Sequence, residues 1–229
     1  MQPKTQKIFS RNALLVFSGG QDSTTCLHWA LHNFKNVQAI FFNYGQRHAI
    51  EQTSAVKIAE LNNIPLKIIA LDFFSQIGSN ALTDSTLEIE SKAGELPNTF
   101  VPGRNLIFIS CAASYAYSLG ITDIITGVCQ TDYSGYPDCR QDTISALAKV
   151  ISLGLDKEVT IHTPLMQMTK AETVDLAIKL NALKSLAYSH SCYEGNYPPC
   201  GQCPACILRA KGFKEAGIPD PLLTRTTEV

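Results

Sequence analysis

The sequence predicts an α/β fold, a doubly wound sheet of five parallel strands with helices on both faces. Short apolar runs alternate with longer stretches of helical periodicity over most of the 229 residues. Strands that alternate with helices in this way lie parallel in one sheet, because each helix carries the chain back to the end where the next strand starts. A glycine pair, Gly19-Gly20, also follows the first apolar run, where a strand must turn sharply into a helix.

The five strands are recognised in order by their apolar residues. The first is the run Ala13-Leu14-Leu15-Val16-Phe17, which precedes the helix-like stretch from Thr25 to Leu31. The other four lie at residues 37–42, 66–71, 123–126 and around 159–161.

The helices between these strands follow from their periodicity and their end signals. We expect them over about 47–62, 106–119 and 143–154. Thr169-Lys170-Ala171-Glu172 has the spacing of a capping box and predicts a helix that reaches about Leu180. The polar segment 72–100 is too long for an ordinary connection, so we expect it to be a lid or an insert.

Composition limits the class of protein. Apolar residues make up 45% and charged residues 17% of the chain, which suits a single globular domain over residues 1–229. The net charge of −1 gives no basic field that would favour nucleic acid or an anionic membrane. The first apolar run is too short for a signal peptide, and no run approaches membrane-spanning length, so we expect a cytoplasmic protein. A homodimer is one possible assembly.

The most informative segment is Ser18-Gly19-Gly20-Gln21-Asp22-Ser23-Thr24, at the expected junction of strand and helix. Glycines let backbone N–H groups turn toward an anion, and the helix N-terminus adds partial positive charge. No Lys-Ser/Thr pair closes the segment, so it is not a Walker A loop. The alternative is a simple glycine turn in which Asp22 or Ser23 caps the helix.

A second polar segment, Gly127–Arg140, follows the expected fourth strand. Its carboxylates can accept the paired donors of a guanine-type edge, its tyrosines can stack on a flat ring, and its arginine can bind an anion. The candidate substrate-binding residues are Asp132, Tyr133, Tyr136, Asp138 and Arg140. The alternative is a solvated surface loop. Cys129 and Cys139 are more typical of small buried side chains than of nucleophiles.

Two further basic residues lie where they can reach an anion. Arg104 follows a Pro-Gly turn just before a helix, although a surface ion pair would explain it equally well. Lys170 lies in the first turn after the fifth strand and can reach phosphate, and a solvated lysine is the alternative. Tyr44-Gly45-Gln46-Arg47-His48 follows the second strand, where the adenosine half of a nucleotide would lie.

Four of the eight cysteines lie together near the C-terminus, at Cys192, Cys200, Cys203 and Cys206. This spacing can bring four thiolates around one tetrahedral zinc, with no position left open for catalysis. Disulfides are disfavoured in a reducing cytosol. An iron–sulfur cluster needs the same four thiolates and stays open as the rival.

Taken together, these motifs resemble the N-type ATP pyrophosphatases (the PP-loop family) and, within them, the 7-cyano-7-deazaguanine synthase family of queuosine biosynthesis. The matching pieces are Phe17–Leu27, Tyr44–His48, Pro97–Asn105, Gly127–Arg140 and the four cysteines. The resemblance implies the adenine nucleotide alpha hydrolase-like fold, with strand order 3-2-1-4-5 and a small zinc-binding segment at 186–216. The segments after the first and fourth strands would then lie side by side at the switch point.

The resemblance also implies a reaction, in which 7-carboxy-7-deazaguanine and ammonia give the 7-cyano product with ATP and Mg²⁺. Catalytic roles would fall to Ser18, Asp22, Ser23 and Arg104. Binding of ATP would involve Lys170 and the loop residues Phe17, Ser18, Gly19, Gly20, Gln21, Asp22, Ser23, Thr24, Thr25, Cys26 and Leu27. The five candidate residues of Gly127–Arg140 would hold the substrate ring.

Two other classes stay open from the sequence. A tRNA-modifying enzyme with the same loop would transfer sulfur or an amine to an adenylated base, but it would normally need a basic RNA-binding face. A non-enzymatic zinc-binding module would use the α/β part only to sense a nucleotide. The chain has no room for a glutamine-hydrolysing domain of typical size, so we expect free ammonia as the nitrogen source.

Overall fold

The computed structural model describes residues 9–46, 50–77, 80–83, 87–89, 96–131 and 136–225. Its centre is a parallel sheet of five strands in the order β3-β2-β1-β4-β5, which confirms both the expected sheet and its order. The strands are β1 (Phe9–Val16), β2 (Phe34–Asn43), β3 (Leu66–Ala70), β4 (Asp123–Ile125) and β5 (Thr160–His162).

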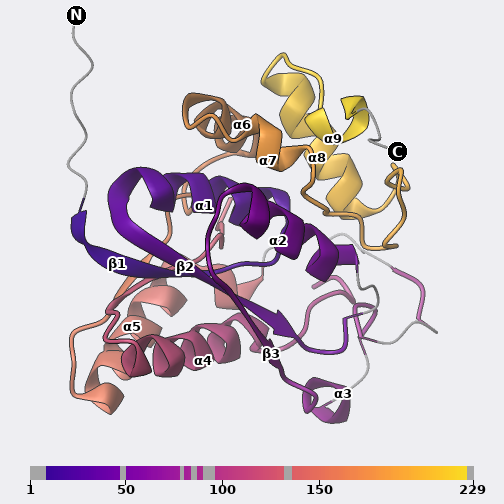
Figure 1. Cartoon of the computed structure of the whole chain (residues 1–229). Helices are drawn as coiled ribbons and strands as arrows, with labels where there is room; N and C mark the ends of the chain where they lie inside the picture. The colour runs from indigo at the N-terminus through magenta and orange to yellow at the C-terminus, as the bar shows by residue number, and fades with distance from the viewer. Residues whose placement is uncertain are drawn as a thin grey trace, which may run out of the picture.

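Helices cover both faces of this sheet (Figure 1). On one face lie α1 (Gln21–Asn33) and α2 (Ile50–Leu61), and on the other lie α4 (Arg104–Ser118) and α5 (Gln141–Leu155). Successive side chains of β1 point to opposite faces of the sheet, and both faces are apolar. Leu15 packs with the core under α1 and α2, while Leu14 packs with the core under α4 and α5.

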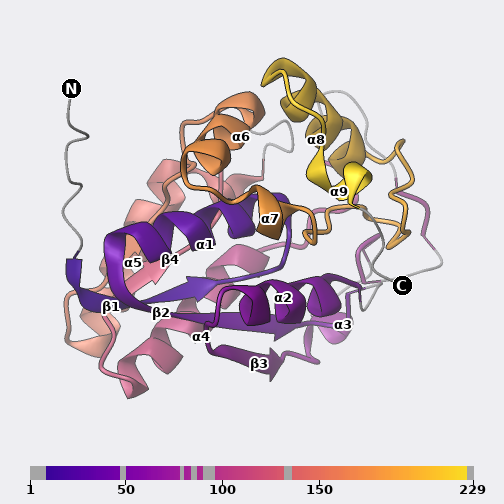
Figure 2. The ribbon, with the colours of Figure 1, turned by 45° about the horizontal axis from the view of Figure 1, so that its top comes forward.

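The C-terminal quarter forms a separate layer beside α1 (Figures 1 and 2). It contains α6 (Lys170–Lys179), α7 (Leu183–Leu186), α8 (Pro204–Glu215) and α9 (Pro221–Thr224). Val174, Ala177 and Phe213 form part of its small core. The predicted capping box is present, because Thr169 Oγ1 accepts from the N–H of Glu172 and the Glu172 carboxylate accepts from the N–H of Thr169.

Several boundaries differ from those that the sequence predicts. Strand β1 begins at Phe9, with exposed residues that extend the strand beside β2 past an irregularity between Phe9 and Asn12. Strand β2 begins directly after α1, so the two elements are joined without a loop. The segment expected as a lid or insert contains the short helix α3 (Phe74–Ile77). None of the described helices combines the length and the apolar character that crossing a membrane requires.

Candidate functional site

The loop Ser18–Thr24 lies at the carboxyl end of β1 and runs into α1. Gly19 has a φ of +76°, which a side chain would strain, and it lies directly against α2. A Cβ at this position would lie 2.6 Å from the backbone N of Ala55 and 2.9 Å from the carbonyl oxygen of Glu51. Glycine is therefore required both by the backbone conformation and by the approach of α2.

Hydrogen bonds between the two serines close this loop on itself. The Oγ atoms of Ser18 and Ser23 lie 3.1 Å apart, and the N–H of Ser18 donates to Ser23 Oγ at 3.3 Å. Ser23 Oγ also donates to the carbonyl oxygen of Gly20 at 3.2 Å. Gly20 is the N-cap of α1 and has no side chain to accept from the first N–H groups of that helix. The first N–H groups of α1 therefore have no side-chain cap from Gly20, and the anion site predicted there stays a prediction.

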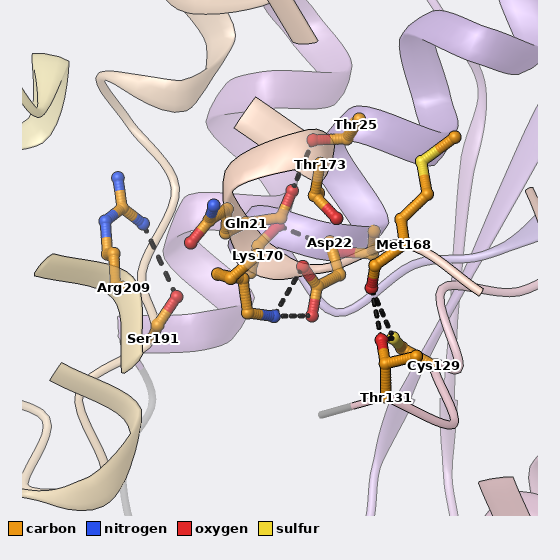
Figure 3. A network of polar contacts seen from close by, with 12 residues as sticks. Gln21, Asp22, Thr25, Cys129, Thr131, Met168, Lys170, Thr173, Ser191 and Arg209 are labelled. Atoms are coloured by element: carbon orange, nitrogen blue, oxygen red, sulfur yellow. Dashed lines mark hydrogen bonds and ion pairs between the residues drawn. The ribbon is translucent and has the colours of Figure 1, made fainter. Parts of the chain in front are cut away.

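Asp22 and Lys170, two candidate residues separated by 148 positions, form an ion pair beside the loop (Figure 3). Lys170 Nζ donates to both carboxylate oxygens of Asp22, at 2.9 and 2.7 Å. The lysine side chain is 9% exposed and the aspartate side chain 27% exposed. Lys170 therefore lies at the loop, and its predicted contact with phosphate stays a prediction.

The segment after β4 lies beside this loop, as the predicted strand order requires. A Cβ on Gly127 would lie 3.1 Å from the backbone N of Ser23 and 3.2 Å from the carbonyl carbon of Asp22. Further along, Thr131 Oγ1 and Cys129 Sγ both donate to the carbonyl oxygen of Met168 (Figure 3). The contact of Gly127 confirms that the turns after β1 and β4 lie side by side, and the contacts with Met168 join the turn after β4 to the segment after β5.

A second group of residues surrounds Arg104, the first residue of α4. Its Nη1 donates to the hydroxyl of Tyr44 at 3.1 Å, and its guanidinium lies 5.5 Å from the ring centre of Tyr44 and 6.0 Å from that of Phe108. Burial acts against the charged form, but Tyr44, Tyr136, Tyr193 and Asp138 hold the pKa of Arg104 above its usual range. Arg104 is therefore a fixed cation lined by aromatic rings.

Two of the five predicted substrate-binding residues belong to this group. Tyr136 is buried, bonds through its hydroxyl to Thr99 Oγ1 at 2.8 Å and packs against the ring of Phe100. Asp138 is also buried, but its Oδ2 accepts from both the backbone N and the Nδ2 of Asn105, each at 3.0 Å. The Asp138 carboxylate thus holds the first turn of α4, which orients Arg104.

The remaining site predictions are not brought together in the same way. Asp132 and Tyr133 lie outside the described residues, as do Arg47 and His48. Arg140 has an exposed side chain at the start of α5. Side chains of the loop motif that lie in or against the core under α1 and α2 are Phe17, Thr24, Thr25, Cys26 and Leu27. A nucleotide would reach those five through their backbone alone, so their role stays a prediction.

Glu51 is a candidate that sequence reasoning missed. It lies in the first turn of α2, and its carbonyl oxygen borders Gly19. Within the part of the chain described here, its carboxylate makes no hydrogen bond and no ion pair. Burial raises the pKa of Glu51 from 4.5 to about 7, against the attraction of Arg104. The only signal in the sequence was its position three residues after the Tyr44–His48 motif.

Tyr193 and His190 were also missed, because the cysteines around them suggested only a metal site. Burial, with Tyr136 close by, raises the pKa of Tyr193, whose ring packs with the cluster of Tyr44 and Val101. The N–H of His190 donates to the carbonyl oxygen of Gly19 at 3.0 Å. The C-terminal segment thus borders both the loop and the Arg104 group.

The four predicted metal ligands converge. The Sγ atoms of Cys192, Cys200, Cys203 and Cys206 all lie within 4.8 Å of one another, a set that fits a tetrahedral zinc site. Burial acts to raise the pKa of Cys200, but the backbone N–H groups of Gln202 and Cys203 outweigh it and lower that pKa to about 7. Burial raises the pKa of Cys203 and Cys206, and a bound cation would favour both thiolates.

Two open surface hollows lie apart from these groups. One, of about 500 Å³, is lined by residues of α2 and β3, and the other, of about 530 Å³, by residues 163–168 and α6. Neither is lined by the loop or by Arg104. The candidate site is therefore described by its polar side chains and backbone.

Comparison with known proteins gives a consistent result. The family model of the queuosine biosynthesis protein QueC matches residues 12–217. The 7-cyano-7-deazaguanine synthase of Chromobacterium violaceum is 55% identical over 93% of this chain and 93% of its own length. The synthase of Laribacter hongkongensis is 55% identical over 95% of this chain and 96% of its own length. The synthase of Bacillus subtilis is 49% identical over 89% of this chain and 94% of its own length.

Among solved structures, the U34-tRNA thiolase NcsA from Methanococcus maripaludis aligns with 95% of this chain and 70% of its own, at 18% identity and a TM-score of 0.48. A likeness that loose bears on neither activity nor substrate. The family model and the relatives match over nearly the whole chain, and the motifs of the loop and of the four cysteines lie within the matched residues. The chain belongs to the QueC family of queuosine biosynthesis proteins.

Proposed function

We propose that this chain converts 7-carboxy-7-deazaguanine and ammonia to 7-cyano-7-deazaguanine, with two molecules of ATP cleaved to AMP and pyrophosphate. The observation that carries the proposal is that α2 borders both groups of residues: the carbonyl oxygen of Glu51 lies against Gly19 of the loop, and its carboxylate interacts electrostatically with Arg104. One part offers an anion site for a triphosphate, and the other offers a fixed cation and aromatic rings for a flat acid. The names of the relatives support the same reaction.

The first half of the reaction makes an amide. A carboxylate is a poor electrophile, so one of its oxygens attacks the α-phosphorus of ATP and pyrophosphate leaves. Ammonia then attacks the carbonyl carbon of this acyl-adenylate, loses a proton and displaces AMP, which takes the first carboxylate oxygen with it. The loop would stabilise the adenylation step, because its N–H groups and hydroxyls would face the charge that develops on the leaving pyrophosphate.

The second half makes the nitrile. The amide oxygen attacks a second ATP at the α-phosphorus, and pyrophosphate leaves again. Loss of both protons from nitrogen then forms the carbon–nitrogen triple bond and expels AMP with the second oxygen. Because both halves need the same α-phosphorus geometry, one loop serves both.

The residue positions support the following roles. Ser18, Ser23 and the first N–H groups of α1 would hold pyrophosphate, with Lys170 as the nearby cation. Asp22 is the carboxylate at the loop and, at 27% exposed, is the residue there that would hold Mg²⁺. When bound, Mg²⁺ neutralises charge on the phosphates. Arg104 would bind the substrate carboxylate, and Tyr136 would contact the ring.

The cysteine site would hold one zinc and serve the fold. Four protein ligands leave no position for a substrate, and the thiolates are closely grouped. Elemental analysis should find one zinc per chain. Iron with acid-labile sulfide in purified active protein would instead establish a cluster and overturn the zinc assignment.

The experiment that tests this proposal identifies the source of the nitrile nitrogen by isotope labelling. Purified protein is incubated with ATP, the 7-carboxy acid, ¹⁵N-ammonium and unlabelled glutamine, and the products are identified by mass spectrometry. The proposal predicts 7-cyano-7-deazaguanine whose nitrile carries ¹⁵N. An unlabelled nitrile would show that glutamine supplies the nitrogen, and the absence of any nitrile would overturn the proposed reaction.

A further inference from the structure

The C-terminal layer touches the phosphate loop through His190. Its backbone N–H donates to the carbonyl oxygen of Gly19 at 3.0 Å, and a Cβ on Gly20 would lie 3.4 Å from the carbonyl oxygen of His190. The His190 side chain is buried, and its Nε2 lies 3.2 Å from the carbonyl oxygen of Cys192, the first of the four metal ligands. A single residue, Ser191, therefore lies between the first metal ligand and the residue that bonds to the loop.

A second contact reaches the loop through Lys170, which forms the ion pair with Asp22. Lys170 packs directly against α8 at Gly212, where a Cβ would lie 2.6 Å from Lys170 Cγ and 3.1 Å from Lys170 Cβ. The same Cβ would lie 3.1 Å from the carbonyl oxygen of Lys170, which cannot move without α6. The position of α8 therefore sets where the Lys170 ammonium can lie.

Helix α8 is in turn fixed at its start by the metal ligands. Cys203 is its N-cap and Cys206 lies in its first turn, while Cys192 and Cys200 belong to the preceding segment. Arg209 on the same helix is buried and bonds to Ser189 Oγ at 2.8 Å and to Asp220 at 2.6 and 2.9 Å. These hydrogen bonds, with those of Arg209 to Ser191 and to the carbonyl oxygen of Leu186, tie α8 to the 186–191 segment.

We infer that the metal site positions the phosphate loop, through His190 on Gly19 and through α8 and Lys170 on Asp22, so that metal binding and ATP binding strengthen each other. The inference rests on the proposed binding of ATP at the Ser18–Thr24 loop. Linkage makes the effect reciprocal: if the metal orders the loop for ATP, then ATP must tighten the hold on the metal. His190 and Gly212 act here as positioning residues, because neither reaches the nucleotide itself.

The first experiment needs no variant. Zinc transfer from the loaded protein to a chromogenic chelator is followed with and without saturating ATP and Mg²⁺. We expect ATP to slow the transfer at least about fivefold, the lower range of ordinary coupling between sites. Transfer at the same rate with and without ATP would overturn the inference. AMP serves as the control ligand, because it lacks the pyrophosphate that the loop would hold.

The second experiment compares two glycines in helices. Gly212→Ala places a methyl group against Lys170, whereas Gly154→Ala in α5 places one where no atom lies within 4 Å. With zinc content and melting temperature recorded, we expect calorimetry to show that Gly212→Ala weakens ATP binding at least about fivefold, and that Gly154→Ala leaves it unchanged. Unchanged ATP affinity in zinc-loaded Gly212→Ala would overturn this inference but not the proposed function. A wild-type protein that does not bind ATP would overturn the proposed function, and the inference with it.

Discussion

At the scale of single residues, the candidate site depends on pairs that are far apart in the sequence. Asp22 and Lys170 are the clearest case, because a partly exposed carboxylate and a nearly buried ammonium meet at 2.7 Å beside the loop. Such a pair keeps the loop close to neutral before ATP binds. When ATP binds, its phosphates would contact the Lys170 ammonium and Mg²⁺ would bind the Asp22 carboxylate.

Replacement of Asp22 tests this pairing. We expect Asp22→Asn to reduce nitrile formation at least about 100-fold, since the carboxylate proposed to hold Mg²⁺ is lost, and to lower stability because the ion pair with Lys170 is lost. Asp142→Asn is the matched control, another aspartate in the first turn of a helix, and is exposed. It should keep activity and stability. Equal activity of Asp22→Asn and Asp142→Asn would contradict the assignment.

Glu51 gives a prediction on pH. Its pKa is raised to about 7 in the folded chain, so between about 4.5 and 7 the folded state keeps a proton that the unfolded state has released. The free energy of unfolding of the wild type, relative to Glu51→Gln, should therefore fall as pH rises through that window and then level off. Urea unfolding of both proteins at several pH values measures this difference. A constant difference would show that Glu51 titrates normally.

Asp138 shows what residue-level reasoning from sequence leaves out, while its role toward a substrate stays a prediction. Its type and position suggested recognition of a ring edge, yet its Oδ2 is taken by two donors of Asn105. Hydrogen-bond partners depend on tertiary approach, which spacing along the chain does not reveal. Glu51 illustrates the converse, because an ordinary helix-starting glutamate becomes notable only when α2 brings it beside Gly19 and Arg104.

At the scale of elements, the turn after β1 is held in place by α2. Gly19 both adopts a positive φ and leaves no room for a Cβ beside the backbone of Ala55. The capping box at Thr169 and the strand runs of β2 and β3 were predictable from sequence, since local hydrogen bonds and apolar patterns specify them. The polar start of β1 was not, because only its pairing with β2 extends it.

Two glycines separate the effect of conformation from that of packing. Gly120 has a φ of +69° with no atom within 4 Å of an added Cβ, whereas Gly19 combines a φ of +76° with backbone contacts below 3 Å. Gly120→Ala should cost about 1–2 kcal/mol of stability from the left-handed conformation alone and leave ATP binding intact. Gly19→Ala should cost more and weaken ATP binding. Thermal unfolding and calorimetry measure both, and equal losses would show that the approach of α2 to Gly19 is unimportant.

At the scale of the whole molecule, the sheet order places the turns after β1 and β4 side by side, and the C-terminal layer borders the same end of the sheet. The sequence predicted the order and the four cysteines through motifs and resemblance, and both are confirmed. It did not predict that the metal-binding segment would bond to the loop. That contact joins Gly19 to His190 across most of the chain, and no local pattern encodes it.

The central claim is that each carboxylate oxygen of the substrate leaves as part of AMP. It is tested most directly with 7-carboxy-7-deazaguanine labelled with ¹⁸O in both carboxylate oxygens, incubated with the protein, ATP, Mg²⁺ and ammonium. The account predicts two AMP for each nitrile formed, each AMP carrying one ¹⁸O in its phosphate as read by mass spectrometry. Formation of ADP and phosphate, or of AMP without the label, would contradict it.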